Sequence, residues 1–464
     1  MKKEIEKLRE KAKHIISFLK QRKVQIIIIG ILILAIIIWS SWIRLQNLPL
    51  LKDSTTDKYM PLALDPFYFL RLAQTTIEQG SLPEIDMMRA PAAQIGFTKG
   101  LTTSAVVLIY RLGNLFSDIS IEFADVIYPV IFFALGLIVF FFWIKSMTNS
   151  KTIALISSGF LAIIPSYIYR TLAGFSDHEA IGMFAFFSTM LIFTIGLKFL
   201  NKKDEEKDKN YLIKLILLGI LLGFLSSITL ASWGGISKFV FLIIPLSFGF
   251  FWIFEFKDTN QKDKKMFCFV LFYFIWILGT IFTGTFFGYN LIGMIKRIIF
   301  TGTSIFNGLL CIFLLTEFSI LKLKNKFKFL EKRYIKKYRI LVSIIISIVL
   351  GLLLFFIIEK NSLELLTNLF NKFLHPFGNT RTGLTVSENQ QPYLKTWISQ
   401  TGPIFFWLFF GGLCILSIKI SENVKKRKDK ILFIFSWILL ILGILFSRIN
   451  AQHIFNGINL ISKV

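Results

Sequence analysis

The sequence predicts an all-α protein that crosses a membrane many times. Of its 464 residues, 54% are hydrophobic and 16% are aromatic, and the mean hydropathy is +0.65. The apolar residues come in runs of about twenty, the length that a helix needs to span the hydrocarbon core. Short clusters of Lys and Arg separate these runs, as expected for cytoplasmic loops. We therefore expect about 11–13 transmembrane helices.

The net charge of +25 reflects membrane topology rather than a nucleic-acid surface. The basic residues lie between the apolar runs, where the positive-inside rule places them, so no nucleic-acid partner is expected. Cys268, Cys311 and Cys414 stand singly within apolar runs and show no CxxC spacing. This arrangement argues against a disulfide framework or a thiol metal site.

The chain opens with "MKKEIEKLREKAKHIISFLKQRK", which is basic and helical in propensity. The apolar stretch that follows is long enough to span, and no A-x-A cleavage site follows it. We interpret residues 1–23 as a cytoplasmic stub and residues 24–464 as a membrane domain.

Apolar runs broken by charge clusters locate the spans. Residues 100–117 are apolar but interrupted by Arg111, and we expect them to form an interfacial helix. The expected spans are 24–45, 122–145, 152–171, 178–199, 211–231, 234–256, 266–288, 300–320, 339–358, 401–420 and 431–447.

Charge and loop length predict which side of the membrane each loop faces. With the N-terminus inside, the even-numbered gaps are cytoplasmic, and they hold most of the loop Lys and Arg. The odd-numbered gaps include the long loops 46–121 and 359–400 and the turn at Asp177. Both long loops and Asp177 are therefore expected on the external face.

The first acidic residue of interest is Asp65, in "LALDPFYFLR". Asp is a good helix N-cap and Pro is favoured at the first helical position, so Asp65 and Pro66 could simply begin a helix. Alternatively, Asp65 presents a carboxylate at the membrane face. The residues leave both interpretations open.

A second acidic group stands where a span begins, in "AGFSDHEAIGMF". Capping accounts for one acid, but Asp177, His178 and Glu179 together are costly at membrane depth, about 2.5–3.5 kcal/mol each at a helix centre. Arg170, just upstream, could offset part of the charge in a plain ion pair. The alternative is that the group binds a cation.

Glu388 lies in the second long loop, in "RTGLTVSENQQPYLKTW", a polar stretch with no helical period. Such a loop is expected to be mobile until ligands order it. The acidic groups on one face supply oxygen ligands of the kind that Mg²⁺ or Mn²⁺ prefers. The four histidines are too far apart for a zinc pattern.

Several motifs in order resemble the catalytic subunit of oligosaccharyltransferase, the membrane enzyme of asparagine-linked glycosylation. "ALDPFYFLR" is similar to the first acidic motif of that family. "IIPSYIYRTLAGFSDHEAIGMFAF" is similar to its Pro-x-Tyr-x-x-Arg…Ala-Gly…Asp-x-Glu segment. "ASWGGI" resembles its Trp-Gly-Gly, and "TVSENQQPYLKTW" resembles its fifth external loop. Together these motifs cover the chain from about residue 60 to 400.

The resemblance implies a C-type glycosyltransferase fold and a metal-dependent, inverting reaction with Mn²⁺ or Mg²⁺. An oligosaccharide would pass from a lipid-linked (pyro)phosphate donor to the asparagine amide of an extended acceptor peptide. The roles that the resemblance assigns are metal binding for Asp65, Asp177 and Glu179, catalysis for Asp65 and Glu388, pyrophosphate binding for Arg448, and support of the site for Arg170 and His178.

The sequence departs from the family pattern in two places. Residue 63 is Ala rather than the acid of some members, and the W-W-D-Y-G motif that reads the acceptor is absent. We therefore expect the C-terminal soluble domain to be absent, with a separate chain as one source of it, and leave open whether this chain is active alone.

Other classes of function remain open at this point. Another C-type glycosyltransferase for lipid-linked sugars and a non-catalytic copy are alternatives, whereas a transporter would place its acids at mid-bilayer. The expected location is the plasma membrane of a prokaryote, an archaeon being favoured.

Overall fold

The computed structural model describes residues 21–88, 93–94, 97–202, 210–256, 263–300, 304–323, 333–358 and 393–423, with residues 367, 434, 437 and 438. It divides into two compact units, which are described separately. The first unit comprises Met1–Ile163, Tyr167–Ile244 and Asp263–Ile305. The second comprises Ile164–Ser166, Pro245–Lys262 and Phe306–Val464.

The described residues are almost entirely helical, which confirms the all-α, multi-pass membrane fold. Six of the helices in this part of the chain are long and apolar enough to cross a membrane. A further pair, Leu394–Thr401 and Pro403–Lys419, passes the same test together but bends by 97° at Gly402. Four shorter apolar helices accompany them. The expected total of 11–13 stays a prediction, since part of the chain lies outside the described residues.

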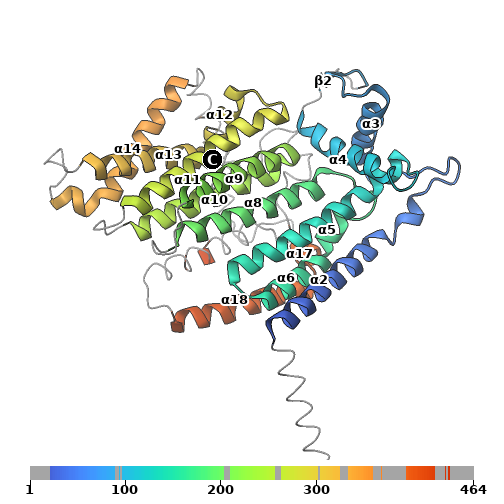
Figure 1. The fold of residues 1–464 in the computed structure, drawn as a ribbon, viewed down its shortest axis with the longest axis horizontal. Coiled ribbons are helices and arrows are strands. Elements are labelled where there is room, and N and C mark those ends of the chain that lie inside the picture. Colours follow the sequence, from blue (N-terminus) through green and yellow to red (C-terminus); the bar gives the residue numbers. More distant parts are fainter. Residues whose placement is uncertain are drawn as a thin grey trace, which may run out of the picture. The chain divides into compact units, whose positions relative to one another are not determined.

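The centre of the first unit is a layer of long helices (Figure 1). α5 (Ile121–Thr148) packs against α8 (His178–Leu200), α8 against α9 (Tyr211–Ser232), and α9 against α11 (Asp263–Gly284). α2 (Arg22–Leu45) lies against α5. These helices occupy the spans expected from the apolar runs.

A close approach of backbones joins α9 to α11. A Cβ added at Gly223 would lie 2.6 Å from the backbone nitrogen of Thr280 and 2.8 Å from Cα of Gly279. Helices pack tightly in membranes where small residues let their backbones meet, because lipid offers little hydrophobic drive for association. The contact therefore sets the distance between α9 and α11 at this point.

The expected span 152–171 is not one continuous helix. α6 (Lys151–Ile163) packs against α2 and α5, and the short α7 (Pro165–Tyr169) follows it. Proline lacks the backbone N–H of a helix interior and disfavours the helical conformation of the residue before it. Pro165 therefore separates the two helices.

A layer of shorter elements packs at one end of the first unit. α3 (Leu64–Gln79) packs on α4 (Phe97–Gly113), the helix expected at 100–117, and α4 packs on α5. A small hairpin of β1 (Ile85–Asp86) and β2 (Ala93–Gln94) follows α3. Arg71 of α3 donates two hydrogen bonds to Asp86, of 3.1 and 2.5 Å, which anchors the hairpin to the helix. The remaining elements of this unit are η1 (Leu48–Leu51), η3 (Thr285–Phe287) and α12 (Leu291–Ile299).

The second unit contains the later part of α10 (Gly234–Glu255), from Pro245 onward, with α13 (Ile305–Leu323) and α14 (Arg333–Ile358). α17 (Leu394–Thr401) and α18 (Pro403–Asn423) follow. Buried Glu317 of α13 accepts hydrogen bonds from α10 and α14 and so joins the three helices.

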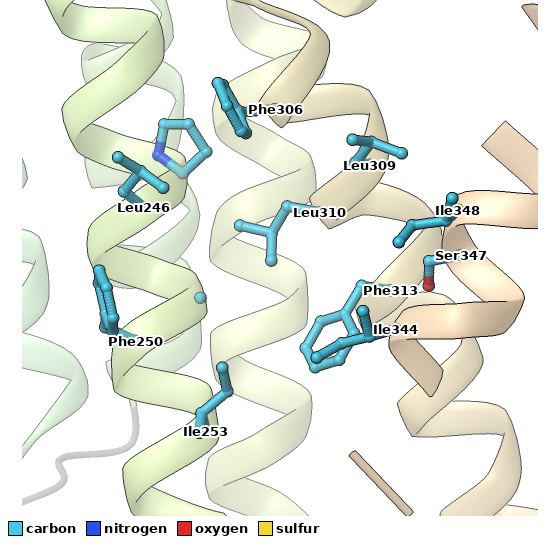
Figure 2. A pocket seen from close by; sticks show the side chains of 12 residues that line it. Leu246, Phe250, Ile253, Phe306, Leu309, Leu310, Phe313, Ile344, Ser347 and Ile348 are labelled. Atoms are coloured by element: carbon cyan, nitrogen blue, oxygen red, sulfur yellow. The ribbon is translucent and has the colours of Figure 1, made fainter. Parts of the chain in front are cut away.

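An apolar cavity of about 340 Å³ lies between α10, α13 and α14. Figure 2 shows Leu246, Phe250, Leu310 and Phe313 lining it, with Ser347 as a rare polar member. A cavity with this lining offers hydrocarbon surface and almost no polar partner.

Candidate functional site

The chain segment that leads into α8 is fixed by backbone hydrogen bonds from three parts of the first unit. The amide of Ala173 donates to the carbonyl of Arg44 at 3.0 Å, and the amide of Gly174 donates to the carbonyl of Val126 at 2.7 Å. The carbonyl of Gly174 accepts from the amide of Leu62 at 2.8 Å. Gly174 has φ of +84°, the left-handed region that favours glycine. The loop before α3 is therefore tied to the segment before α8.

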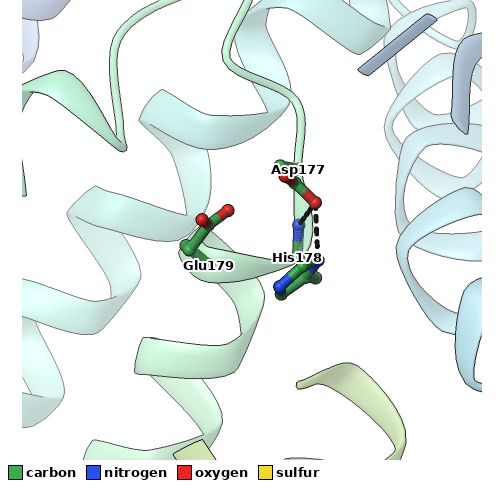
Figure 3. A group of neighbouring side chains, drawn as sticks. All are labelled: Asp177, His178 and Glu179. Carbon is green, nitrogen blue, oxygen red and sulfur yellow. Dashed lines mark hydrogen bonds and ion pairs between the residues drawn. The ribbon is translucent and has the colours of Figure 1, made fainter. Parts of the chain in front are cut away.

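Asp177 caps the N-terminus of α8, as the sequence suggested for one of the two acids. Its Oδ1 accepts a hydrogen bond of 2.7 Å from the backbone nitrogen of His178 and lies 2.5 Å from His178 Nδ1 (Figure 3). Burial opposes ionisation of this carboxyl, but the hydrogen bonds and charge of His178 outweigh it. The pKa of Asp177 therefore lies below its ordinary value.

Glu179 lies in the first turn of α8, across from the Asp177–His178 pair in Figure 3. Its Oε1 accepts a hydrogen bond of 2.8 Å from Arg170 Nη1, the ion pair that the sequence offered as one interpretation. Its Oε2 is buried and has no hydrogen-bond partner among the described residues. An oxygen in this condition is available to a further ligand.

A cavity of about 270 Å³ opens beside this cluster. Trp233, at the junction of α9 and α10, lines one wall with its ring centroid 5.5 Å from that of His178. Residues of α3 also line the cavity. The lining residues are Asp65, Tyr68, Phe69, Asp177, His178, Ser232, Trp233 and Gly234. Segments widely separated in the sequence thus meet at one site.

The interpretation of Asp65 as a helix N-cap is wrong. α3 begins at Leu64, with Ala63 as its N-cap, so Asp65 lies in the first turn and Pro66 follows inside it. Asp65 is exposed and lines the cavity. The helix starts two residues earlier than an N-cap at Asp65 would imply, and the Asp65 carboxylate lines the cavity instead of capping the helix.

Side-chain atoms of Asp177, His178 and Glu179 lie within 4.8 Å of one another. Asp65 faces the same cavity but is not a member of that group. The roles expected of Asp65, Asp177, Glu179, His178 and Arg170 remain predictions. Glu388 and Arg448 lie outside the described residues.

The cluster fits a divalent cation. It offers two carboxylates and one imidazole, and one carboxylate oxygen is buried without a partner. Carboxylate oxygens suit Mg²⁺ and Mn²⁺, whereas an imidazole ligand favours transition metals over Mg²⁺. His178, expected only to support the site, is therefore a candidate ligand beside Asp177 and Glu179.

Two buried side chains on α5 contact the segment before α8, and the sequence did not single them out. Asp125 Oδ2 accepts a hydrogen bond of 2.5 Å from Ser176 Oγ. The hydroxyl of Tyr128 donates to the carbonyl oxygen of Asp177 at 3.2 Å. Both side chains are completely buried. The sequence signal that could have identified them is an Asp and a Tyr three residues apart in "EFADVIYP", within an apolar span. That spacing is about one helical turn and puts both side chains on the same face of the helix.

The fold and this cavity define a multi-pass, all-α membrane protein with an acidic cavity at the ends of its spans. The chain belongs to the family described as oligosaccharyl transferase STT3, N-terminal, whose model matches residues 28–455.

Individual relatives agree with the family. A dolichyl-phosphooligosaccharide-protein glycotransferase 1 from Archaeoglobus fulgidus is 29% identical over 160 residues, which are 34% of this chain and 26% of that protein. The chain thus spans about a quarter of the length of the curated relatives that it matches.

Solved structures share the fold. One is the archaeal oligosaccharyltransferase AglB from Archaeoglobus fulgidus, in complex with an inhibitory peptide and a dolichol-phosphate. It has a TM-score of 0.59 and 16% identity, covering 89% of this chain and 47% of that chain. An oligosaccharyltransferase of the same organism in complex with Zn and sulfate has a TM-score of 0.56 and 16% identity, covering 92% and 48%.

Proposed function

We propose that this chain carries the membrane part of an enzyme that transfers an oligosaccharide from a lipid (pyro)phosphate to the asparagine amide of a protein. The observation that carries the proposal is the meeting of Asp65, Asp177 and His178 at one cavity in a chain of the STT3 family. An acidic cavity at the ends of the spans suits a reaction at the membrane surface, where a lipid-borne donor and a protein acceptor can meet.

A divalent ion, Mn²⁺ or Mg²⁺, would be held by the carboxylates of Asp177 and Glu179, and His178 would add an imidazole ligand that suits Mn²⁺ better than Mg²⁺. Asp65 lines the same cavity. When bound, the ion supplies fixed positive charge that orients the carboxylates and stabilises negative charge on the departing phosphate. Support for a metal comes from the donor set and from the solved relative that contains Zn.

The chain's own carboxylates would activate the acceptor. An amide nitrogen is a poor nucleophile because its lone pair is delocalised into the carbonyl. Asp65, which lines the cavity, would accept a hydrogen bond from one amide N–H, and Glu388, outside the described residues, would accept from the other. These bonds hold the nitrogen lone pair toward the sugar. The nitrogen displaces the (pyro)phosphate at the anomeric carbon in a single step that inverts that carbon. One amide proton passes to one of the two carboxylates, and the (pyro)phosphate leaves toward the proposed partner Arg448.

The proposed partners are a lipid-linked oligosaccharide and an extended asparagine-containing peptide. One solved relative binds a dolichol-phosphate and a peptide, which supports both classes. The apolar cavity of the second unit has the chemistry that a long hydrocarbon chain requires. A separate chain that reads the acceptor belongs to the same proposal. We place the site on the external face of an archaeal plasma membrane, with residues 1–23 in the cytoplasm.

The test is to incubate the purified chain with lipid-linked oligosaccharide, Mn²⁺ and a labelled Asn-x-Thr peptide. Asp65→Ala is the variant, and Asp57→Ala is a matched control because Asp57 is an exposed aspartate of the same loop, paired with Lys52. We expect glycopeptide that requires metal, is lost in Asp65→Ala, and is retained in Asp57→Ala.

Two further outcomes are informative. Glycopeptide that forms only after membranes of the native cell are added would show that a partner chain completes the enzyme. Equal glycopeptide from Asp65→Ala and the unchanged protein would refute the role of this cavity.

A further inference from the structure

α5 contributes three hydrogen bonds to the four residues that lead into the acidic cluster. The carbonyl of Val126 accepts from the amide of Gly174, and Tyr128 donates to the carbonyl of Asp177. Ser176 lies between Gly174 and Asp177, and its hydroxyl donates to Asp125. One turn of α5 therefore contacts the backbone on both sides of Ser176 and the Ser176 side chain itself.

The Asp125–Ser176 contact has the properties of a fixed support. Both residues are completely buried, and the hydrogen bond between them is 2.5 Å long. A buried hydrogen bond between a hydroxyl and a carboxyl oxygen is directional, and losing one partner leaves the other buried and unsatisfied. The second oxygen of Asp125 has no hydrogen-bond partner among the described residues. Within this part of the chain, the Asp125 side chain therefore bonds to Ser176 alone.

Ser176 immediately precedes Asp177, whose side chain must point toward His178 and Glu179 for the cluster to form. The amide of Asp177 donates to the carbonyl of Phe175 at 2.9 Å, so the backbone turns sharply around Ser176. A shift of Ser176 is therefore transmitted directly to the Asp177 carboxylate. Groups that orient metal ligands typically change metal affinity by about 10- to 100-fold when they are lost.

We infer that Asp125 is a positioning residue of the acidic cluster: by holding Ser176, it fixes the Asp177 carboxylate where it can bind a cation together with His178 and Glu179. The inference rests on the proposed function, since it requires that the cluster bind a divalent cation. It gives α5 an indirect role in the site, since no residue of α5 would contact the ion itself.

Mn²⁺ binding to the full chain in detergent micelles tests this inference, with free Mn²⁺ measured by electron paramagnetic resonance. Ser176→Ala removes the donor and Asp125→Leu removes the acceptor, whereas Asp125→Asn keeps an oxygen that can accept from Ser176. We expect about tenfold weaker Mn²⁺ binding in Ser176→Ala and in Asp125→Leu, and recovery of most of this loss in Asp125→Asn.

Ser188→Ala is the matched control, because Ser188 is a buried serine of α8 that donates to the carbonyl of Phe184 in its own helix. It should bind Mn²⁺ as the unchanged protein does. The double variant Ser176→Ala/Asp125→Leu should bind no more weakly than either single variant, because both remove the same bond. Unchanged Mn²⁺ affinity in Ser176→Ala, or losses that multiply in the double variant, would overturn the inference.

Asp177→Asn separates failure of this inference from failure of the proposed site. If Asp177→Asn loses Mn²⁺ binding while Ser176→Ala retains it, the metal site stands and the positioning role fails. If Asp177→Asn binds Mn²⁺ as tightly as the unchanged protein, the metal site itself is refuted, and the positioning role with it.

Discussion

The buried charge pair in the second unit gives a prediction that does not depend on any activity. Glu317 is completely buried and accepts hydrogen bonds from Arg339 Nε at 3.1 Å, Ser343 Oγ at 2.6 Å and Trp252 Nε1 at 3.1 Å. Arg339 also donates to the carbonyl of Phe256 at 2.7 Å. The perturbation is Glu317→Leu, which keeps much of the volume but removes the acceptor of all three bonds.

The size of the effect follows from what is left behind. Arg339 would keep its charge in a buried place with one carbonyl partner, and removing one member of such a pair typically costs about 3–5 kcal/mol. We expect Glu317→Leu to lower the free energy of unfolding by this amount. Ser343→Ala removes one hydrogen bond to a charged group and should cost less, about 1.5–3 kcal/mol.

The double variant Glu317→Leu/Arg339→Met gives the sharper test. Replacing both members of a buried ion pair by apolar residues is often nearly neutral, because no uncompensated charge remains. We therefore expect the double variant to be more stable than Glu317→Leu alone. The assay is equilibrium unfolding in mixed detergent micelles, followed by circular dichroism. The single variants Glu317→Leu and Arg339→Met are measured alongside it. If their losses of stability simply add in the double variant, Glu317 and Arg339 do not act as one coupled pair.

Three further predictions concern glycines and can be checked on purified variants. Gly223→Ala should lower the free energy of unfolding by about 1–3 kcal/mol, because its Cβ would lie 2.6 Å from the backbone nitrogen of Thr280, which cannot yield; an unchanged value would contradict the close approach. Gly30→Ala, with nothing within 4 Å, should instead gain up to about 1 kcal/mol from helix propensity, and a clear loss would count against this. In Gly182→Ala the new Cβ would lie 2.7 Å from Cβ of Trp233. Moving that ring should slow glycopeptide formation by at least about tenfold, and full activity would show that the wall of the cavity tolerates the shift.

Much of the fold could be predicted because the membrane restricts the choices. A chain in hydrocarbon must satisfy its backbone hydrogen bonds internally, so apolar runs of sufficient length become helices. The spans expected at 122–145 and 178–199 correspond to α5 and α8. The break at Pro165 was visible in the sequence as a proline inside an apolar run, but the run's length favoured one helix. At this position the conformational restriction imposed by proline ended the helix, although the apolar run was long enough for one continuous span.

The candidate site was predicted where its geometry is local and missed where it is not. The capping role of Asp177 and its contact with His178 involve adjacent residues, so the sequence carries them. The bond from Ser176 to Asp125 joins residues 51 positions apart, and nothing in either neighbourhood identifies the partner. Asp65 was ambiguous for a related reason: only the packing of α3 decides whether the helix starts at the aspartate or before it.

The hydrogen bond between Leu62 and Gly174 has a consequence for biosynthesis. The donor belongs to the loop beside Asp65, and its acceptor is translated about 110 residues later, which takes roughly 5 to 20 seconds at ribosomal speeds of about 5–20 residues per second. During this interval α2 and α5 can insert, but the loop before α3 lacks the segment of chain to which Leu62 is hydrogen-bonded. The cavity therefore cannot form before the segment leading into α8 and the junction of α9 and α10 have both been translated, because Trp233 at that junction lines it.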